Sequence, residues 1–362
     1  ENDIDGNLIW ESSQSNLKTE IESSVKRCFL PNFLEENLLE NIFHLEKNNG
    51  TKFIIFEPID QIIDLTNNDE DNLDDKSFVI SSLSGFTNEF KENNSIINTS
   101  IPIYKFDNLE YDFLTSQGNF FNCKDFDLAD VLIEGEFDGF GTFNGKIKIY
   151  DEEINYSYTN PRKKDKRNFY GKFPIKLGVS QGVETESKLE KNSWLKINDK
   201  VTEYGGLYLY RDNFRVLPYG RTDFDFLGFE KRRAKRAGSY YFSHRRMFGY
   251  IELSRLINKH LLDKSSREGL INNAQYRTFK YDLESFFLEL AREFFGTDAK
   301  QSLFINNKER IKEQSEAIKA DRKKETAEKS MRLLIANHLQ HLLPNIAAIS
   351  AQVSEKEHID QA

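Results

Sequence analysis

The chain has little cysteine and methionine, and it lacks a long apolar run. Its two cysteines, Cys28 and Cys123, match neither a zinc-binding spacing nor a disulfide framework, so we expect a reducing, cytoplasmic setting. No run of about eighteen apolar residues is present, so no segment is expected to span a membrane, and the N-terminal residues lack the apolar segment of a signal peptide. Because the chain begins at Glu1 rather than at a methionine, we expect a fragment of a longer protein or a processed product.

Charged and aromatic residues are abundant. Of the 362 residues, 30% are charged and 13% are aromatic, and the net charge is -9. This length allows about two or three domains, with aromatic rings supplying much of the core volume. The net negative charge argues against a protein devoted wholly to nucleic acid, although a local basic patch could still bind one.

The pattern up to residue 105 predicts mixed α and β structure. Helices are expected at residues 34–45 and 78–90. Strands are expected at residues 51–56, TKFIIF, and at residues 101–104. We place a domain boundary near residue 105.

The next segment has the short alternating runs that are typical of strands. Strands are predicted at residues 130–137, 146–150 and 173–179, with Gly139-Phe140-Gly141 as a turn. The clearest hairpin is GGLYLYRDNFRVLPYG, residues 205–220. Its Asp212-Asn213 pair tolerates the left-handed backbone that a tight turn requires.

Residues 248–270, FGYIELSRLINKHLLDKSSREGL, predict a buried strand, a loop and a turn that leads into a long helix. Ser265 and Ser266 are candidate N-cap residues for that helix. Apolar residues at helical spacing predict a core-facing helix over residues 276–295, ended by Gly296. Arg267 either presents its guanidinium to a phosphate or pairs with Glu268 or Asp263.

Residues 221–246 form a basic stretch, and PRKKDKR at residues 161–167 is a second one. Basic residues at this density could neutralise phosphates of a nucleotide or of nucleic acid, or they could simply be solvated. The candidate patch for nucleic acid or a partner consists of Lys231, Arg232, Arg233, Lys235, Arg236, Arg245 and Arg246.

A second long helix is predicted over residues 306–343, ending at Pro344. It is charged in its first half and apolar in its second. Heptads are not sustained along it, so a coiled-coil dimer and a purely structural oligomerisation arm both stay open as interpretations.

Three stretches resemble one family. NNGTKFIIF, from residue 48, is similar to the last strand of the ATP-binding domain in the GHKL ATPases, which include the ninety-kilodalton heat-shock chaperones. The hairpin GGLYLYRDNFRVLPYG with FDFLGFEKRR resembles bacterial relatives of these chaperones, and the strand, loop and SREGL turn resemble the chaperone middle domain. The stretches occur in family order over residues 48–296.

The resemblance implies specific roles. Thr51, with Gly50, would contact the adenine of ATP, Arg267 would sense the γ-phosphate, and Lys264 would add a second polar contact in the same loop. The chain departs from the family in lacking an acidic N-box with its catalytic glutamate, a DxGxG pocket and a glycine-rich lid, so ATP and Mg²⁺ would be bound mainly by an upstream segment. It is therefore not expected to hydrolyse ATP alone.

These inferences predict an α+β chain with three parts. Residues 1–105 would be the end of a GHKL nucleotide domain, residues 106–296 a βαβ transducer domain, and residues 297–362 a helical extension. The predicted function is to sense the γ-phosphate and convert ATP binding and hydrolysis into domain rearrangement, in a homodimer acting on a protein client or nucleic acid. The alternative is a nucleic-acid-binding or sensor module that uses residues 221–246.

Overall fold

The computed structural model describes residues 83–92, 100–105, 108–113, 120–162, 166–235, 240–265 and 268–359, together with Thr19. The chain divides into two compact units, residues 1–84 with 98–119 and residues 85–97 with 120–362. In the first unit, strands β1 (Pro102–Lys105) and β2 (Asn108–Asp112) form an antiparallel pair, which confirms the strand predicted at residues 101–104. The predicted helix at 34–45 and strand at 51–56 lie outside the described residues.

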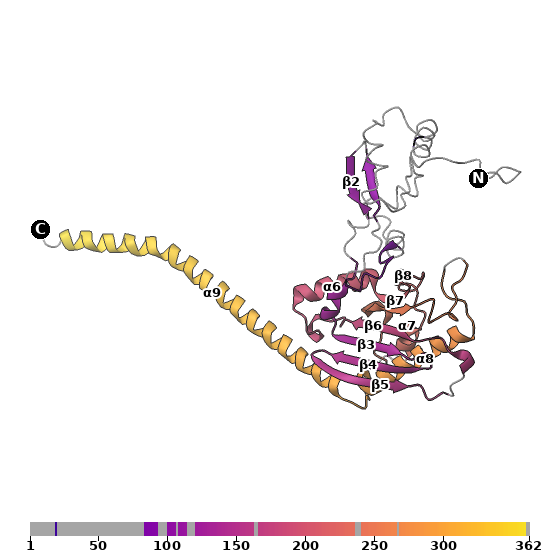
Figure 1. The fold of residues 1–362 in the computed structure, drawn as a ribbon. Helices are drawn as coiled ribbons and strands as arrows, with labels where there is room; N and C mark the ends of the chain where they lie inside the picture. Colours follow the sequence, from indigo (N-terminus) through magenta and orange to yellow (C-terminus); the bar gives the residue numbers. More distant parts are fainter. Residues whose placement is uncertain are drawn as a thin grey trace. The chain divides into compact units, whose positions relative to one another are not determined.

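The second unit contains a mixed seven-stranded sheet in the order β5-β4-β3-β6-β9-β7-β8 (Figure 1). Its strands are β3 (Val131–Phe137), β4 (Thr142–Ile149), β5 (Glu152–Thr159), β6 (Phe173–Val179), β7 (Gly206–Arg211), β8 (Phe214–Arg215) and β9 (Met247–Leu253). All neighbours are antiparallel except β7 and β9, which run parallel. The predicted α+β class is confirmed at this level.

The helices and shorter turns of the second unit connect these strands. The α-helices are α6 (Lys191–Tyr204), α7 (Phe229–Lys235), α8 (Ala274–Leu290) and α9 (Leu303–Ile359). A π-helical turn, η6 (Ala291–Phe295), extends α8 up to Gly296, as the sequence predicts. The 3-10 turns are η2 (Cys123–Leu128), η3 (Lys166–Asn168), η4 (Glu184–Glu186) and η5 (His244–Arg246).

One face of the sheet packs against α8. Alternate residues of β9, Met247, Ile251 and Leu253 among them, point into this core, because successive side chains of a strand lie on opposite faces. From α8 the core receives side chains at helical spacing, all of them fully buried: Phe279, Leu283, Phe286, Phe287 and Leu290, followed by Phe294 of η6. The predicted core-facing helix at 276–295 is confirmed.

The opposite face carries two kinds of side chain. Over β3, β4 and β6 it is charged, with ion pairs such as Lys176–Glu134 at 3.1 Å. Over β7 and β9 it is aromatic, and here Phe90 inserts among rings that include Tyr208 and Tyr250 at centroid distances of 5.5 and 5.7 Å. Residues 85–92 therefore form a strap that covers this end of the sheet.

The strap corrects the second half of the helix predicted at residues 78–90, whereas Leu83 is helical and residues 78–82 lie outside the described residues. Residues 84–90 are turn and bend, and Thr87 forms a bridge with Phe214. Gly85 adopts φ +63, a left-handed conformation that ends helical structure. The chain after it carries Phe90 into the aromatic cluster, where the side chain is buried. Although we predicted a domain boundary near residue 105, this strap packs with the second unit.

Helix α9 corrects a second prediction, because it continues through Pro344 to Ile359. A proline inside a helix removes one backbone hydrogen bond, and the flanking leucines and alanines are strong helix formers that tolerate this loss. Within the described residues, none of the helices combines the length and apolar character needed to cross a membrane.

Candidate functional site

The hairpin and the SREGL segment, which are separated by some fifty residues of sequence, lie together at the end of β7 and β9. The hairpin turn is as predicted, with Asp212 and Asn213 at φ 48 and 74. Its first residue connects directly to the chain leaving β9: the Asp212 amide donates to the Leu253 carbonyl at 2.9 Å, and the Asp212 carboxylate accepts from the Arg255 amide at 3.2 Å. The turn therefore holds the beginning of the loop that follows β9.

Asn258 fixes the first half of this loop. Its side chain is 1% exposed, accepts from the Ser254 amide at 2.8 Å, and donates to the Tyr170 and Lys172 carbonyls at 2.9 and 3.1 Å. A buried amide with all these contacts satisfied is costly to move, since displacing it would leave polar groups unpaired. The first half of the loop thus follows a fixed path from the hairpin turn to the residues that precede β6.

The second half of the loop closes on itself to form a base. Asp263 and Leu270 make an antiparallel bridge, the Lys264 amide donates to the Gly269 carbonyl at 2.9 Å, and the Ile271 amide donates to the Leu262 carbonyl at 2.7 Å. Gly269 adopts φ +97, a conformation that favours glycine. We call residues 265–268, between the two paired flanks, the loop tip.

Arg211 of β7 clamps the base of the loop. Its guanidinium lies 3.1 Å from the Asp263 carboxylate, and its Nη2 donates to the Leu261 carbonyl at 2.5 Å. The Arg211 side chain is 6% exposed, whereas that of Asp263 is 32% exposed. The Arg211 Nε and the Asp263 Oδ1 form an ion pair without hydrogen-bond geometry, so the hydrogen bond to the Leu261 carbonyl is the directional contact that holds the loop base against the hairpin.

Tyr219 holds the other flank. Its hydroxyl accepts from the Leu270 amide at 3.4 Å and lies 3.2 Å from the Tyr276 hydroxyl, and Leu217 forms a parallel bridge with Glu268. Burial raises the pKa of Tyr219 well above its ordinary value, so its hydroxyl stays neutral and continues to serve both contacts. The described residues on both flanks of the loop tip are therefore held by the hairpin 205–220.

The predicted site residues fall into two groups. Lys264 is exposed at the base of the loop tip. Arg267, Gly50 and Thr51 lie outside the described residues, so their roles stay predictions. The acid Asp263, one of the two predicted partners of Arg267, is paired with Arg211.

The predicted N-cap of the following helix, at Ser265 or Ser266, is wrong. The N-cap is Asn273, whose side chain accepts from the Tyr276 amide at 2.8 Å, and α8 begins at Ala274. Ser265 lies in a turn, and Glu268 forms a parallel bridge with Leu217. Arg211 and Tyr219 hold the two flanks of the loop base. The helix therefore begins only after the loop base, at the Asn273 N-cap.

The predicted basic patch is partly neutralised. Arg232 pairs with Glu284 at 2.9 Å and donates to the Leu227 carbonyl, and the pKa of Glu230 is lowered, because hydrogen bonds and the nearby positive charges of Arg233 and Arg245 outweigh its burial. Of the remaining predicted residues, Lys231, Lys235 and Arg245 are exposed, Arg246 is half-buried, and Arg236 lies outside the described residues. Arg232 is thus bound within the fold, whereas Lys231, Lys235 and Arg245 keep their charges at the surface, so the phosphate-binding role of this patch stays a prediction.

Arg162, from the other basic stretch, is bound inside the protein. Its Nε and Nη2 donate to Asp282 of α8 at 2.7 and 2.6 Å, and Asp282 also accepts from Asn160 at 2.9 Å and Tyr170 at 3.0 Å. Asp282 is fully buried. A Cβ at Gly141 would lie 2.8 Å from its carboxylate, so only glycine fits there. We call this cluster the Asp282 pin.

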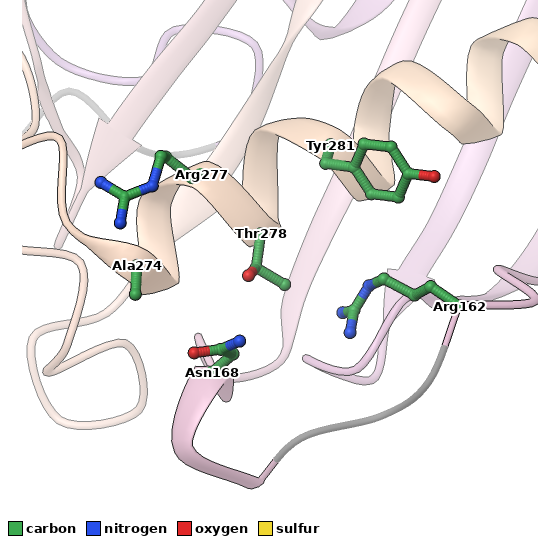
Figure 2. A pocket seen from close by; sticks show the side chains of 6 residues that line it. All are labelled: Arg162, Asn168, Ala274, Arg277, Thr278 and Tyr281. Atoms are coloured by element: carbon green, nitrogen blue, oxygen red, sulfur yellow. The ribbon is translucent and has the colours of Figure 1, made fainter.

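A shallow cavity of about 240 Å³ lies beside the pin, at the start of α8 (Figure 2). It is lined by Arg162, Asn168, Ala274, Arg277, Thr278 and Tyr281. Arg277 extends away from Arg162 in this view, and its guanidinium donates to the Asn272 carbonyl at 2.9 Å. Because the charge of Arg162 is balanced by Asp282, the cavity is not a concentrated anion site.

Sequence reasoning did not identify Arg211, Asn258, Tyr219 or Asp282. Arg211 and Tyr219 lie within the hairpin quoted above. The hairpin pattern therefore predicted where they lie, but their residue types did not reveal their contacts with the loop. Asp282 follows apolar residues on a core-facing helix, a placement that marks a buried and paired acid. No group of three or more metal-ligating side chains occurs among the residues that the structure describes.

No family model and no curated protein matches this chain. Among solved structures, it is similar to the B subunit of DNA gyrase from Myxococcus xanthus, at 8% identity, over 60% of this chain and 78% of that chain, with a TM-score of 0.19. At that TM-score the likeness establishes neither a shared fold nor a function.

Proposed function

We propose that this chain is the transducer portion of a GHKL-type ATPase, and that its loop tip responds to the γ-phosphate of ATP. Arg267 would be the group that meets the phosphate, with Lys264 as a second cation. The observation that supports this role is the clamped loop base: Arg211 and Tyr219 hold both flanks of residues 265–268. In this proposal, the held flanks limit how far Arg267 has to be ordered when it meets the phosphate.

The proposed chemistry uses the properties of a guanidinium. Arginine stays charged at any physiological pH and donates several hydrogen bonds from a planar fork, which suits a phosphate that gains negative charge during transfer. A preplaced cation stabilises that charge most when its own position costs no rearrangement. The contacts of Asn258 and Arg211 fix the loop up to Asp263, and we propose that this base gives Arg267 the required position.

The remaining parts of the site would come from a nucleotide domain that this chain contains only in part. Thr51 and Gly50 would contact adenine. The part of the chain that the structure describes offers no set of ligands for Mg²⁺, so we assign the metal, the catalytic base and the phosphate cradle to the nucleotide domain. Binding of ATP there would favour the state in which the loop tip docks, because only the triphosphate offers Arg267 its partner.

The test is ATP turnover by the protein together with its nucleotide domain. Arg267→Ala is expected to lower turnover roughly 10³-fold, which is the effect of removing a phosphate-directed arginine. ATP affinity should change only a few-fold, because adenine and the other phosphates are bound elsewhere. Normal turnover in this variant would refute the role of Arg267, and absence of ATP hydrolysis by the wild-type protein would refute the proposed function.

A matched control is available in the same loop. Arg255 is 77% exposed and pairs only loosely with Asp212 at 3.5 Å. Arg255→Ala removes the same charge from the same loop and is expected to leave turnover within about twofold, since an exposed pair contributes little. An equal loss in both variants would show that general loop charge, rather than the loop tip, governs turnover.

A further inference from the structure

Helix α9 consists of a docked beginning and an undocked remainder. Phe304 and Asn307 are buried at its start, and Lys308 pairs with Glu186 at 2.9 Å. The last contact with the body is Lys319 to Glu184 at 3.5 Å. From residue 320 to residue 350, every side chain that the structure describes is exposed, and α9 continues as one helix (Figure 1).

The undocked part changes character at residue 333. Residues 320–332 are rich in charge, and their ion pairs are internal to the helix, as in Lys329–Glu325 at 2.7 Å. From Leu333 to Ser354 the sequence contains no lysine, arginine, aspartate or glutamate. The first part is stable in water as a single helix, whereas the second exposes large apolar side chains that water disfavours.

The apolar side chains form one seam. Ile335, Leu339, Leu342, Ile346 and Ile349 are between 47% and 61% exposed and follow one another at alternating intervals of four and three residues. This spacing is that of the a and d positions of a heptad, and it places the five side chains on one face of the helix. Although heptads are not sustained over the whole helix, this short run is regular, and Pro344 lies on the opposite side of it.

The positions beside the seam indicate what covers it. In a coiled coil these flanking positions meet their counterparts in the partner helix, and among the described side chains they are occupied by His338, Ala336 and Ser350. None is an acid, a lysine or an arginine, so two identical helices meet without like-charge repulsion. A helix that lies on a membrane surface instead typically carries lysine and arginine beside its apolar face, and residues 333–354 have neither.

We infer that residues 335–349 of α9 are an interaction surface for the same residues of a second copy of this chain. The seam Ile335, Leu339, Leu342, Ile346 and Ile349 is self-complementary and spans roughly 20 Å along the helix axis. It joins chains through their distal helices and leaves the loop 254–270 uncovered by the contact. The inference does not depend on the proposed role in nucleotide sensing.

The test is the molar mass of the whole chain in solution, measured by sedimentation equilibrium from micromolar to about 100 μM. The wild-type chain is expected to self-associate. Leu342→Glu with Ile346→Glu places two charges in the seam and is expected to weaken association at least 100-fold, to a monomer over this range. A wild-type chain that stays monomeric overturns the inference, whether or not it sediments with anionic phospholipid vesicles.

The matched control carries the same two charges on the opposite face. Gln340→Glu with Ala347→Glu is expected to associate as the wild type does, because these positions lie away from the seam. If this control also becomes monomeric, or if the seam variant still associates, the seam is not the interface. Circular dichroism of each variant, with thermal melting of the body, confirms that the comparison is between folded chains.

Discussion

Two arginine–aspartate pairs in this molecule look alike chemically but are placed differently. In the Asp282 pin, the carboxylate is fully buried and receives hydrogen bonds from Arg162, Asn160 and Tyr170. In the loop clamp, the arginine is the buried partner: Arg211 is 6% exposed, and Asp263 is 32% exposed at the base of a loop. One pair joins α8 to the end of β5, whereas the other joins β7 to the loop 254–270.

The different placement of the two pairs indicates different roles, one in the stability of the fold and one in the position of a loop. In the pin, the charge of Arg162 is neutralised by the buried Asp282. This arginine of the basic segment PRKKDKR therefore stabilises the fold and is not available to a phosphate. The contacts of the clamp are made with the loop base, at Leu261 and Asp263. We therefore expect changes to the pin to act on stability. If the proposed function holds, changes to the clamp will act on ATP turnover, measured for the protein together with its nucleotide domain.

The largest effect on stability is expected at the pin. Asp282→Ala removes the acceptor of several buried donors and leaves the Arg162 charge without a partner, which should lower the free energy of unfolding by about 3–5 kcal/mol. Urea denaturation measures this change. ATP turnover per folded molecule should remain near the wild-type value.

An exposed ion pair provides the reference for the pin. Lys146 and Glu153 lie 2.7 Å apart, yet their side chains are 60% and 54% exposed. Lys146→Ala should leave the urea denaturation curve close to that of the wild type, because solvent screens the pair. If Asp282→Ala costs no more than this reference substitution, the pin does not carry the burial energy that its geometry indicates.

A smaller effect on stability and a larger one on turnover are expected at the clamp. Arg211→Ala frees the base of the loop, and displacing a reacting group by about 1 Å costs roughly 10²-fold in rate. We expect turnover to fall roughly 10- to 100-fold and the free energy of unfolding to fall by about 1–3 kcal/mol, as for a lost hydrogen bond to a charged group. Steady-state ATP hydrolysis and urea denaturation of the same preparation separate the two.

Comparison with Asp263→Ala identifies the clamp itself. If Arg211 acts by holding Asp263, the double variant should be little worse than Arg211→Ala alone, because both substitutions break one contact. Additive losses in turnover would mean that the two residues act independently, and unchanged turnover in Arg211→Ala would mean that the loop tip does not need this base.

Sequence patterns predicted the fold well where local signals agreed with tertiary packing. The core-facing residues of α8, the strand at Phe173–Val179 and the tight turn at Asp212-Asn213 each have a spacing or residue type that permits one structure. Patterns failed at the strap 85–92 and at Pro344. In the first case a distant aromatic cluster draws Phe90 out of a helix, and in the second good helix formers on both sides tolerate the proline.

The candidate site was predictable only in outline. Its two segments were recognisable by their residues, but the contacts between them depend on β7 lying beside β9, and strand order is not encoded in either segment. The predicted cap at Ser265 failed for the same reason, because the competing contacts come from Arg211 and Tyr219, which are far away in the sequence. The pairing of Arg162 with Asp282 likewise links residues 120 positions apart.

The last comparison is between the tyrosines of the two pairs, each of which contributes a single hydroxyl group. Tyr170 donates to the charged Asp282 at 3.0 Å, whereas Tyr219 accepts from a neutral amide at 3.4 Å. Hydrogen bonds to charged groups are the stronger kind, so near pH 7 Tyr170→Phe should cost roughly 1.5–3 kcal/mol and Tyr219→Phe roughly 0.5–1.5 kcal/mol. Urea denaturation measures both, and equal losses would contradict the ranking.

The pH dependence sharpens this last comparison. Burial, followed by the negative charge of Asp282, raises the pKa of Tyr170 well above its ordinary value of 10.0. Above pH 10 the unfolded chain loses this proton while the folded chain keeps it, so the contribution of Tyr170 is complete below pH 10 and declines as the pH rises. The difference in unfolding free energy between wild type and Tyr170→Phe should therefore shrink by roughly 1.4 kcal/mol per pH unit above 10. A difference that stays constant up to pH 11 would mean that the tyrosine ionises equally in both states.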